Sequence, residues 1–161
     1  VQAKGFDVLL AAWQSVPAQL WIAGEGPQRS QLEALIHDYR LHDRVRLLGQ
    51  RDDIGVLMEA ADLLVLPSCR EGFPYVLLEA LHHRLPVVAT RVPGAVDVLP
   101  QPWLVPIEDA AALTAAVSRA LSDPLRLQTD FNALWDRAGE ELSLATMVQR
   151  TEAVYRKVLH G

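Results

Sequence analysis

The sequence predicts an α/β fold, a Rossmann-like doubly wound parallel sheet with helices on both faces. Two observations lead to this expectation. Residues 63–66 and 87–89 are uninterrupted apolar runs, which are typical of strands buried on both faces of a parallel sheet. Between them, apolar residues recur at helical spacing from Val76 to Leu81. A strand, a helix and a second strand in this order form the unit from which such sheets are built.

The same patterns alternate along the whole chain. Strands are expected at residues 18–23, 44–48, 63–66, 87–89 and 103–105. Helices are expected from Phe6, from a cap and first turn at Gly26-Pro27, through residues 57–60, from Pro74, over residues 113–121, after a cap at Asp123-Pro124, and from about Ser143. Proline suits the start of a helix because the first N–H groups have no partner inside the helix.

Composition limits the classes of protein to which the chain can belong. Its 161 residues, half of them hydrophobic, suffice for one globular domain. A net charge of −5 with scattered Lys and Arg disfavours a nucleic-acid partner. The single cysteine, Cys69, fits a reducing compartment, and a nucleophilic role is disfavoured because no histidine is fixed beside it. No apolar run reaches the about 18 residues that cross a bilayer, so we expect a cytoplasmic domain without a transmembrane segment.

Two carboxylates flank the start of the helix expected from Pro74. Glu71 precedes it and Glu79 lies in its second turn. In parallel sheets, ligands bind beyond the carboxyl ends of the strands, where Glu71 is expected to lie. The tip of the helix favours a phosphate, because its N–H groups are unpaired and carry partial positive charge. A sugar attached to a phosphate satisfies both features, since its hydroxyls can donate to the carboxylates.

A longer motif surrounds these carboxylates. It reads Pro67-Ser68-x-x-Glu71-Gly72-Phe73-x-x-x-Leu77-Leu78-Glu79-Ala80-Leu81, followed by Leu85-Pro86-Val87-Val88-Ala89-Thr90. Shorter matching strings lie at residues 4–7, 22–27, 45–49 and 61–62 and at Tyr155. The motif resembles the signature of the group 1 retaining glycosyltransferases. These are two-domain GT-B enzymes that use nucleotide-diphosphate sugars, and the signature belongs to their C-terminal, donor-binding domain.

The resemblance implies specific roles for residues of this chain. Lys4 grips the donor diphosphate, together with backbone N–H groups near Phe73 and the helix tip. Glu71 holds hydroxyls of the donor sugar, and Glu79 accepts hydrogen bonds from the ribose. Glu71 and Lys4 are therefore the expected catalytic residues. The expected donor-binding residues are Lys4, Gly24, Gly26, Glu71, Gly72, Phe73, Pro74, Tyr75, Val76 and Glu79.

The resemblance also implies a reaction and a larger protein. The sugar is transferred with retention to a glycan, a lipid or another cell-surface precursor, in polysaccharide biosynthesis. Residues 1–161 then form a nucleotide-sugar-binding fragment without the family's first strand and N-terminal acceptor domain. The terminal helix, residues 143–159, packs toward that missing domain. The isolated fragment is expected to be inactive, and the whole protein is cytoplasmic or lies at a membrane surface.

The sequence departs from the family pattern at three positions. Arg84 stands where the family commonly ends its helix with glycine, so we expect the turn to be built differently, because a left-handed cap disfavours non-glycine residues. Pro93 replaces the first of two usual glycines and removes a backbone N–H. Asp97 replaces the usual glutamate of that loop.

Alternative functions stay open at this point. A Gly-x-Gly follows the strand at residues 18–23, but Arg29 replaces the third glycine of the dinucleotide motif, which disfavours NAD. The five histidines show no ligand spacing, so we expect no metal and no cofactor, with the nucleotide sugar as substrate. The alternatives are a non-catalytic nucleotide-sugar-binding module and a nucleotide-sugar epimerase of the same two-domain plan.

Overall fold

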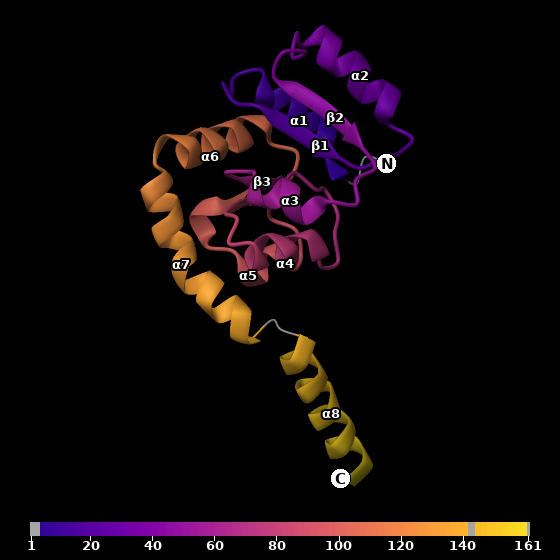
Figure 1. Cartoon of the computed structure of the whole chain (residues 1–161), viewed down its shortest axis with the longest axis vertical. Coiled ribbons are helices and arrows are strands. Elements are labelled where there is room, and N and C mark those ends of the chain that lie inside the picture. The colour runs from indigo at the N-terminus through magenta and orange to yellow at the C-terminus, as the bar shows by residue number, and fades with distance from the viewer. Residues whose placement is uncertain (1–3, 142–143, 161) are drawn as a thin grey trace.

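The computed structural model describes residues 4–141 and 144–160 (Figure 1). The strands are β1 (Leu20–Ala23), β2 (Val45–Gly49), β3 (Leu64–Leu66), β4 (Val87–Thr90) and β5 (Leu104–Val105). The helices are α1 (Phe6–Trp13), α2 (Arg29–Asp38), α3 (Ile54–Glu59), α4 (Tyr75–His82), α5 (Ala95–Val98), α6 (Ala110–Ser122), α7 (Pro124–Glu141) and α8 (Leu144–His160), and a 3₁₀ turn η2 (Gln101–Trp103) precedes β5. The alternation of strands and helices expected from the sequence is confirmed.

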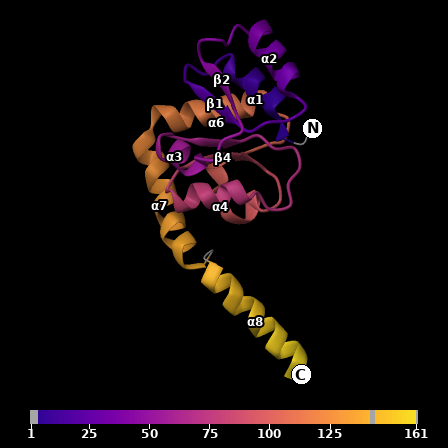
Figure 2. The ribbon, with the colours of Figure 1, turned by 45° about the vertical axis from the view of Figure 1, so that its right-hand side comes forward.

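The strands pair in parallel, as expected. β1 pairs with β2, with Leu20 opposite Val45. β4 lies between β3 and β5 in a three-stranded sheet, with Val65 opposite Val88. All four residues of β4 are buried, which agrees with a central strand covered on both faces. Figure 2 shows α6 and α4 on opposite sides of β4, so helices cover both faces of this sheet.

The core joins the two sheets through α1 and α6. These helices pack against each other, and Leu10 of α1 and Val117 of α6 are fully buried. The hydroxyl of Thr114 on α6 donates to the carbonyl of Ala12 on α1 at 3.1 Å. Because α1 begins at Phe6, two residues after Lys4, this packing also fixes where Lys4 lies.

Several element boundaries differ from the sequence expectation. β1 begins at Leu20 rather than at residue 18, and the carbonyl of Ala18 ahead of it accepts the indole N–H of Trp13 at 2.9 Å. α2 begins at Arg29 with Gln28 as its N-cap, so Gly26 and Pro27 precede the helix instead of forming its first turn. Pro74 is likewise the N-cap of α4 rather than its first residue.

The expectation that Arg84 changes the turn after α4 is wrong. Arg84 adopts φ 52°, the left-handed conformation that glycine normally supplies. The N–H of Arg84 donates to Leu81 and that of Leu85 donates to Ala80, at 3.1 and 2.9 Å. These bonds form a Schellman cap. Burial of Leu85, which is 4% exposed, stabilises the turn despite the side chain on Arg84.

α2 ends in the same way. Arg40 adopts φ 54°. The N–H of Arg40 donates to His37 at 3.0 Å and that of Leu41 donates to Ile36 at 2.8 Å. Leu41 is fully buried, so a buried leucine after a left-handed arginine closes both helices.

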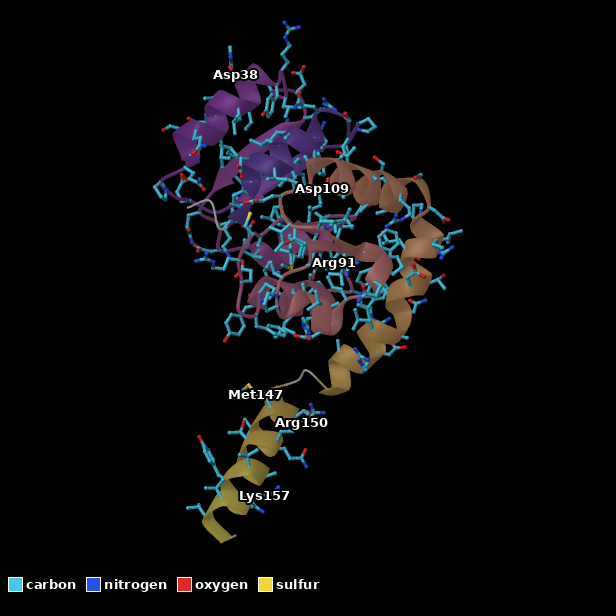
Figure 3. All side chains as sticks on the ribbon, turned by 180° about the vertical axis from the view of Figure 1, so that it is seen from behind. Asp38, Arg91, Asp109, Met147, Arg150 and Lys157 are labelled. Atoms are coloured by element: carbon cyan, nitrogen blue, oxygen red, sulfur yellow. The ribbon has the colours of Figure 1, made fainter. Side chains whose placement is uncertain are left out.

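α7 packs against α4 and α6, with Phe131 fully buried, and α8 follows it in the chain. The carboxylate of Asp123 accepts the N–H of Arg126 at 3.0 Å, which confirms the expected cap of α7. Ser143, the expected start of the last helix, lies outside the described residues, and α8 is described from Leu144. Figure 1 shows α8 extending away from the sheets, and Figure 3 labels Met147 on it. No helix among the described residues is long and apolar enough to cross a membrane.

Candidate functional site

The candidate site lies where β3 and β4 end. The chain leaves β3 at Leu66 and runs through residues 67–74 before α4 begins. Ser68 in this loop is 4% exposed, and Thr90 at the end of β4 is 2% exposed. The hydroxyl of Thr90 donates to the carbonyl of Ser68 at 2.5 Å and lies 3.3 Å from that of Leu66. Thr90 therefore fixes the backbone where the loop leaves the sheet.

The carboxylate of Glu71 is the polar centre of this site. The ammonium of Lys4 lies 2.6 Å from its Oε1, and the side chain of Glu71 is only 16% exposed. The hydroxyl of Ser68 donates to the same oxygen at 2.9 Å. The fold thus brings together Lys4 and Glu71, two of the residues that the sequence analysis selected. No role was expected for the hydroxyls of Ser68 and Thr90.

Gly5 explains why Lys4 reaches the loop. Gly5 caps α1 with φ 64°, and a Cβ at this position would lie 2.0 Å from the carbonyl oxygen of Pro67. Real Cβ atoms do not approach a backbone oxygen so closely, so only glycine allows the start of α1 to contact the loop after β3. The side chain of Lys4, which is 57% exposed, then projects beside Glu71.

Gly94 supports the same loop from the other side. It adopts φ 79°, and a Cβ on it would lie 2.9 Å from Cδ2 of Phe73 and 3.1 Å from Cδ of Pro74. Its N–H donates to the carboxylate of Asp97 at 3.2 Å. Asp97 therefore caps the short helix α5 in this structure, which gives the unusual aspartate of this loop a structural role. Pro93 is exposed beside it.

α4 presents the remaining expected donor-binding residues. Leu77, Ala80 and Leu81 face the core. Phe73 and Tyr75 are exposed to 40% and 78%, and Gly72 and Glu79 are also exposed. Val76 is half-buried, and the first N–H groups of α4 lack partners inside the helix, as at every helix start. The tip of α4 and its outer face are therefore open to a ligand.

The ends of β1 and β2 form a neighbouring polar region. The N–H of Gly24 donates to the carbonyl of Gly49 at 2.7 Å, and Gly26 is exposed. Arg29 forms salt bridges with Glu25 and Glu33, both at 2.9 Å. The hydrogen bond and charge of Glu25, followed by the hydrogen bond of Glu33, raise the pKa of Arg29.

In the loop after β2, Arg51 and Asp53 pair side by side. Two nitrogens of the Arg51 guanidinium donate to the two carboxylate oxygens of Asp53, at 2.7 and 2.5 Å. The hydrogen bond from Arg51 lowers the pKa of Asp53. The pair fixes the plane of the guanidinium in the loop that follows β2.

Cys69 lies two residues before Glu71 in the sequence but lacks the features of a nucleophile. Burial raises the pKa of its thiol, and the charges of Glu108 and Asp7 raise it further. The protein environment therefore favours the thiol over the reactive thiolate. This agrees with the sequence expectation that Cys69 is not catalytic.

Two cavities lie away from the residues of this site. Within the described residues, no group of three or more His, Cys, Asp or Glu side chains is placed to hold a metal ion. A cavity of about 500 Å³ lies at the opposite end of β3 and β4, where Asp62, His83 and Trp135 are among its lining residues. A smaller cavity of about 260 Å³ lies beside Arg29 and His42.

Comparison with known proteins identifies the family. Residues 1–123 match the model of the family "Glycosyl transferases group 1". The chain is 32% identical over 165 aligned residues to the gpi3 subunit of phosphatidylinositol N-acetylglucosaminyltransferase from Schizosaccharomyces pombe, covering 96% of this chain and 36% of that protein. The chain thus spans about a third of the length of that relative.

Solved structures show the same fold. Sucrose-phosphate synthase from Thermosynechococcus elongatus superposes with a TM-score of 0.88 at 32% identity, over 99% of this chain and 43% of that one. Anabaena HepE, solved in complex with UDP-glucose, superposes with a TM-score of 0.90 at 25% identity, over 98% of this chain and 46% of that one. With a family match over most of its length and relatives of the same fold, this chain belongs to the group 1 glycosyltransferases.

Proposed function

We propose that the chain is the donor-binding domain of a retaining GT-B glycosyltransferase. It binds a nucleotide-diphosphate sugar, and in the whole protein it takes part in transfer of that sugar to a glycan, a lipid or another cell-surface precursor. The observation that carries the proposal is the contact of Lys4 with Glu71 at 2.6 Å, beside the open tip of α4. In this proposal, the cation, the carboxylate and the unpaired N–H groups at the start of α4 surround one ligand.

The cation and the helix tip suit the diphosphate. Lys4 is exposed, so its ammonium can turn from Glu71 to a phosphate oxygen without disturbing the core. The N–H groups at the start of α4 add partial positive charge. In glycosyl transfer, negative charge develops on the leaving diphosphate, and each donor aimed at such charge contributes about 3 kcal/mol where water is excluded. Lys4 and the α4 tip therefore stabilise the leaving group in this proposal.

The two glutamates suit the sugar and the ribose. Glu71 accepts hydrogen bonds from hydroxyl groups of the transferred sugar. Glu79, exposed on the outer face of α4, accepts hydrogen bonds from the two neighbouring hydroxyls of the ribose. UDP-glucose is the first donor to test, because HepE was solved with it. The family resemblance implies that the sugar keeps its anomeric configuration, by front-face attack without an enzyme-bound sugar.

The proposal includes transfer without a metal ion. The charge of the diphosphate is then met by Lys4 and the helix tip alone. Donor binding is expected to be the same in EDTA and in excess Mg²⁺. A tenfold or greater loss of affinity in EDTA would show that a metal ion shares this role.

The acceptor is expected to bind in another part of the whole protein. α8 exposes an apolar stripe, which a partner surface of that part would cover. Its members are Met147, Val148, Val154, Tyr155, Val158 and Leu159. We propose that this stripe packs on the N-terminal acceptor domain, in a protein that works in the cytoplasm or on a membrane surface. Charged substitutions at Val154 and Val158 are expected to lower the activity of the whole protein while leaving UDP affinity of the 161-residue chain unchanged.

Calorimetric titration of the 161-residue chain tests donor binding. UDP-glucose, UDP-N-acetylglucosamine, GDP-mannose and ADP-glucose are compared with free glucose. Binding of at least one nucleotide sugar, with none of glucose, supports the proposal, and binding of none of them contradicts it. An assay of the whole protein for sugar transfer, against the isolated chain, then separates a transferase from a non-catalytic module.

A further inference from the structure

Oε1 of Glu71 accepts two hydrogen bonds from donors that differ in their freedom to move. The Lys4 side chain is 57% exposed and extends from the start of the chain. Ser68 is 4% exposed, and its hydroxyl lies 2.9 Å from the same oxygen. A phosphate can draw the ammonium of Lys4 away, but it cannot reach the buried hydroxyl of Ser68. After Lys4 has moved, Ser68 is the donor that remains on Oε1.

Ser68 is itself held by the sheet. Thr90 is 2% exposed at the end of β4, and its hydroxyl donates to the carbonyl of Ser68 at 2.5 Å. It also lies 3.3 Å from the carbonyl of Leu66, the last residue of β3. The position of the Ser68 backbone is thus tied to two strands. A hydroxyl fixed in this way gives the carboxylate of Glu71 one orientation, whether or not Lys4 is in contact.

We propose that Ser68 is a positioning residue for the donor sugar. It occupies Oε1 of Glu71, so that Oε2 is left as the acceptor for a hydroxyl of the sugar. Thr90 supports Ser68 through its backbone carbonyl. This inference rests on the proposed function, because it concerns how Glu71 meets the sugar. It adds that recognition of the sugar, but not of the nucleotide, depends on the Ser68 hydroxyl.

Comparing the affinities for UDP and for UDP-glucose separates recognition of the nucleotide from recognition of the sugar. They are measured by calorimetry on the 161-residue chain, as wild type and with Ser68→Ala, Glu71→Ala and both changes together. Ser68→Ala is expected to leave the Kd for UDP within twofold and to weaken UDP-glucose by about tenfold, the effect of losing a hydrogen bond to a charged group. The double variant is expected to match Glu71→Ala alone, since Ser68 acts through Glu71.

Two further variants guard against a general effect on folding. Ser68→Cys keeps the size of the side chain but donates weakly, so its UDP-glucose affinity is expected between those of wild type and Ser68→Ala. Ser122→Ala, which removes a hydroxyl bonded to the backbone of α6, is expected to change neither affinity.

Each outcome separates this inference from the proposed function. If Glu71→Ala weakens UDP-glucose selectively but Ser68→Ala does not, Ser68 has no positioning role and the proposed function stands. Equal loss of UDP and UDP-glucose affinity in Ser68→Ala, or losses that add in the double variant, also overturn the inference. Failure of the wild-type chain to bind any of the nucleotides or nucleotide sugars overturns the proposed function, and the inference with it.

Discussion

Gly94 lies directly against Phe73. A Cβ on Gly94 would lie 2.9 Å from Cδ2 and 3.1 Å from Cα of Phe73, and Gly94 has φ 79°. The loop after β4 thus supports the loop after β3, which carries Glu71 into the site. The two loops can pack together because Gly94 has no side chain at the point where they meet.

Gly94→Ala is expected to destabilise the protein and to disturb donor binding. The left-handed backbone costs an alanine about 1–2 kcal/mol, and the new methyl group displaces Phe73. Thermal unfolding and UDP-glucose titration measure the two effects. Gly139→Ala is the matched control, because Gly139 lies within α7 with open space around its Cβ. That change should stabilise the helix by about 0.5–1 kcal/mol. Wild-type stability and affinity in Gly94→Ala would show that the contact is not needed.

Arg84→Gly and Arg40→Gly are each expected to stabilise the protein by about 1 kcal/mol. Both arginines adopt left-handed conformations in Schellman caps, which favour glycine. Arg84 also pairs with Asp136 at 3.2 Å on the surface, where such a pair contributes little. Denaturant unfolding measures the gain. Alanine at either position keeps the Cβ and is expected to give none; a similar gain with alanine would disprove the backbone explanation.

Glu79→Ala is expected to weaken UDP binding by about tenfold, because a carboxylate that accepts ribose hydroxyls is lost. Glu152→Ala on α8 is a suitable control, since Glu152 is an exposed carboxylate whose partner Arg156 lies on the same helix. Calorimetry with UDP isolates the nucleotide from the sugar. Unchanged UDP affinity in Glu79→Ala would remove Glu79 from the site.

Cys69 is expected to react slowly with iodoacetamide at pH 8. Its pKa is raised by burial and by nearby carboxylates, so the thiolate fraction in the folded chain is smaller than in the unfolded chain. The rate should rise as pH increases above 9 and should increase at pH 8 when urea unfolds the protein. Mass spectrometry measures the modified fraction over time. Faster modification in the folded chain than in urea would reveal an activated thiol.

Sequence patterns predicted the order of the elements because a buried parallel strand requires a continuous apolar run. They were less reliable where a tertiary contact decides a boundary. Residue 103 was expected to open the last strand, yet Trp103 ends a 3₁₀ turn, with its indole N–H donating to Asp130 of α7 at 3.1 Å. No local pattern contains a contact between residues so far apart.

The site was predicted only in part for a similar reason. The motif and the resemblance placed Lys4 and Glu71 together, but the hydrogen bonds of Ser68 and Thr90 depend on how β3 and β4 align. The left-handed turn at Arg84 was missed because backbone preference alone disfavours arginine there, whereas the burial of Leu85 offsets that cost. In both cases, packing decided a geometry that residue type alone left open.

NMR spectra of the ¹⁵N-labelled 161-residue chain, recorded during titration with UDP-glucose, test the central claim most directly. The amide signals of Phe73, Tyr75 and Val76 report on the tip of α4, and those of Gly5 and Glu71 report on the position of the sugar and diphosphate. The account predicts saturable shifts concentrated at these residues and at Glu79. Shifts confined to the cavity beside Trp135, or no saturable shift at all, would contradict it.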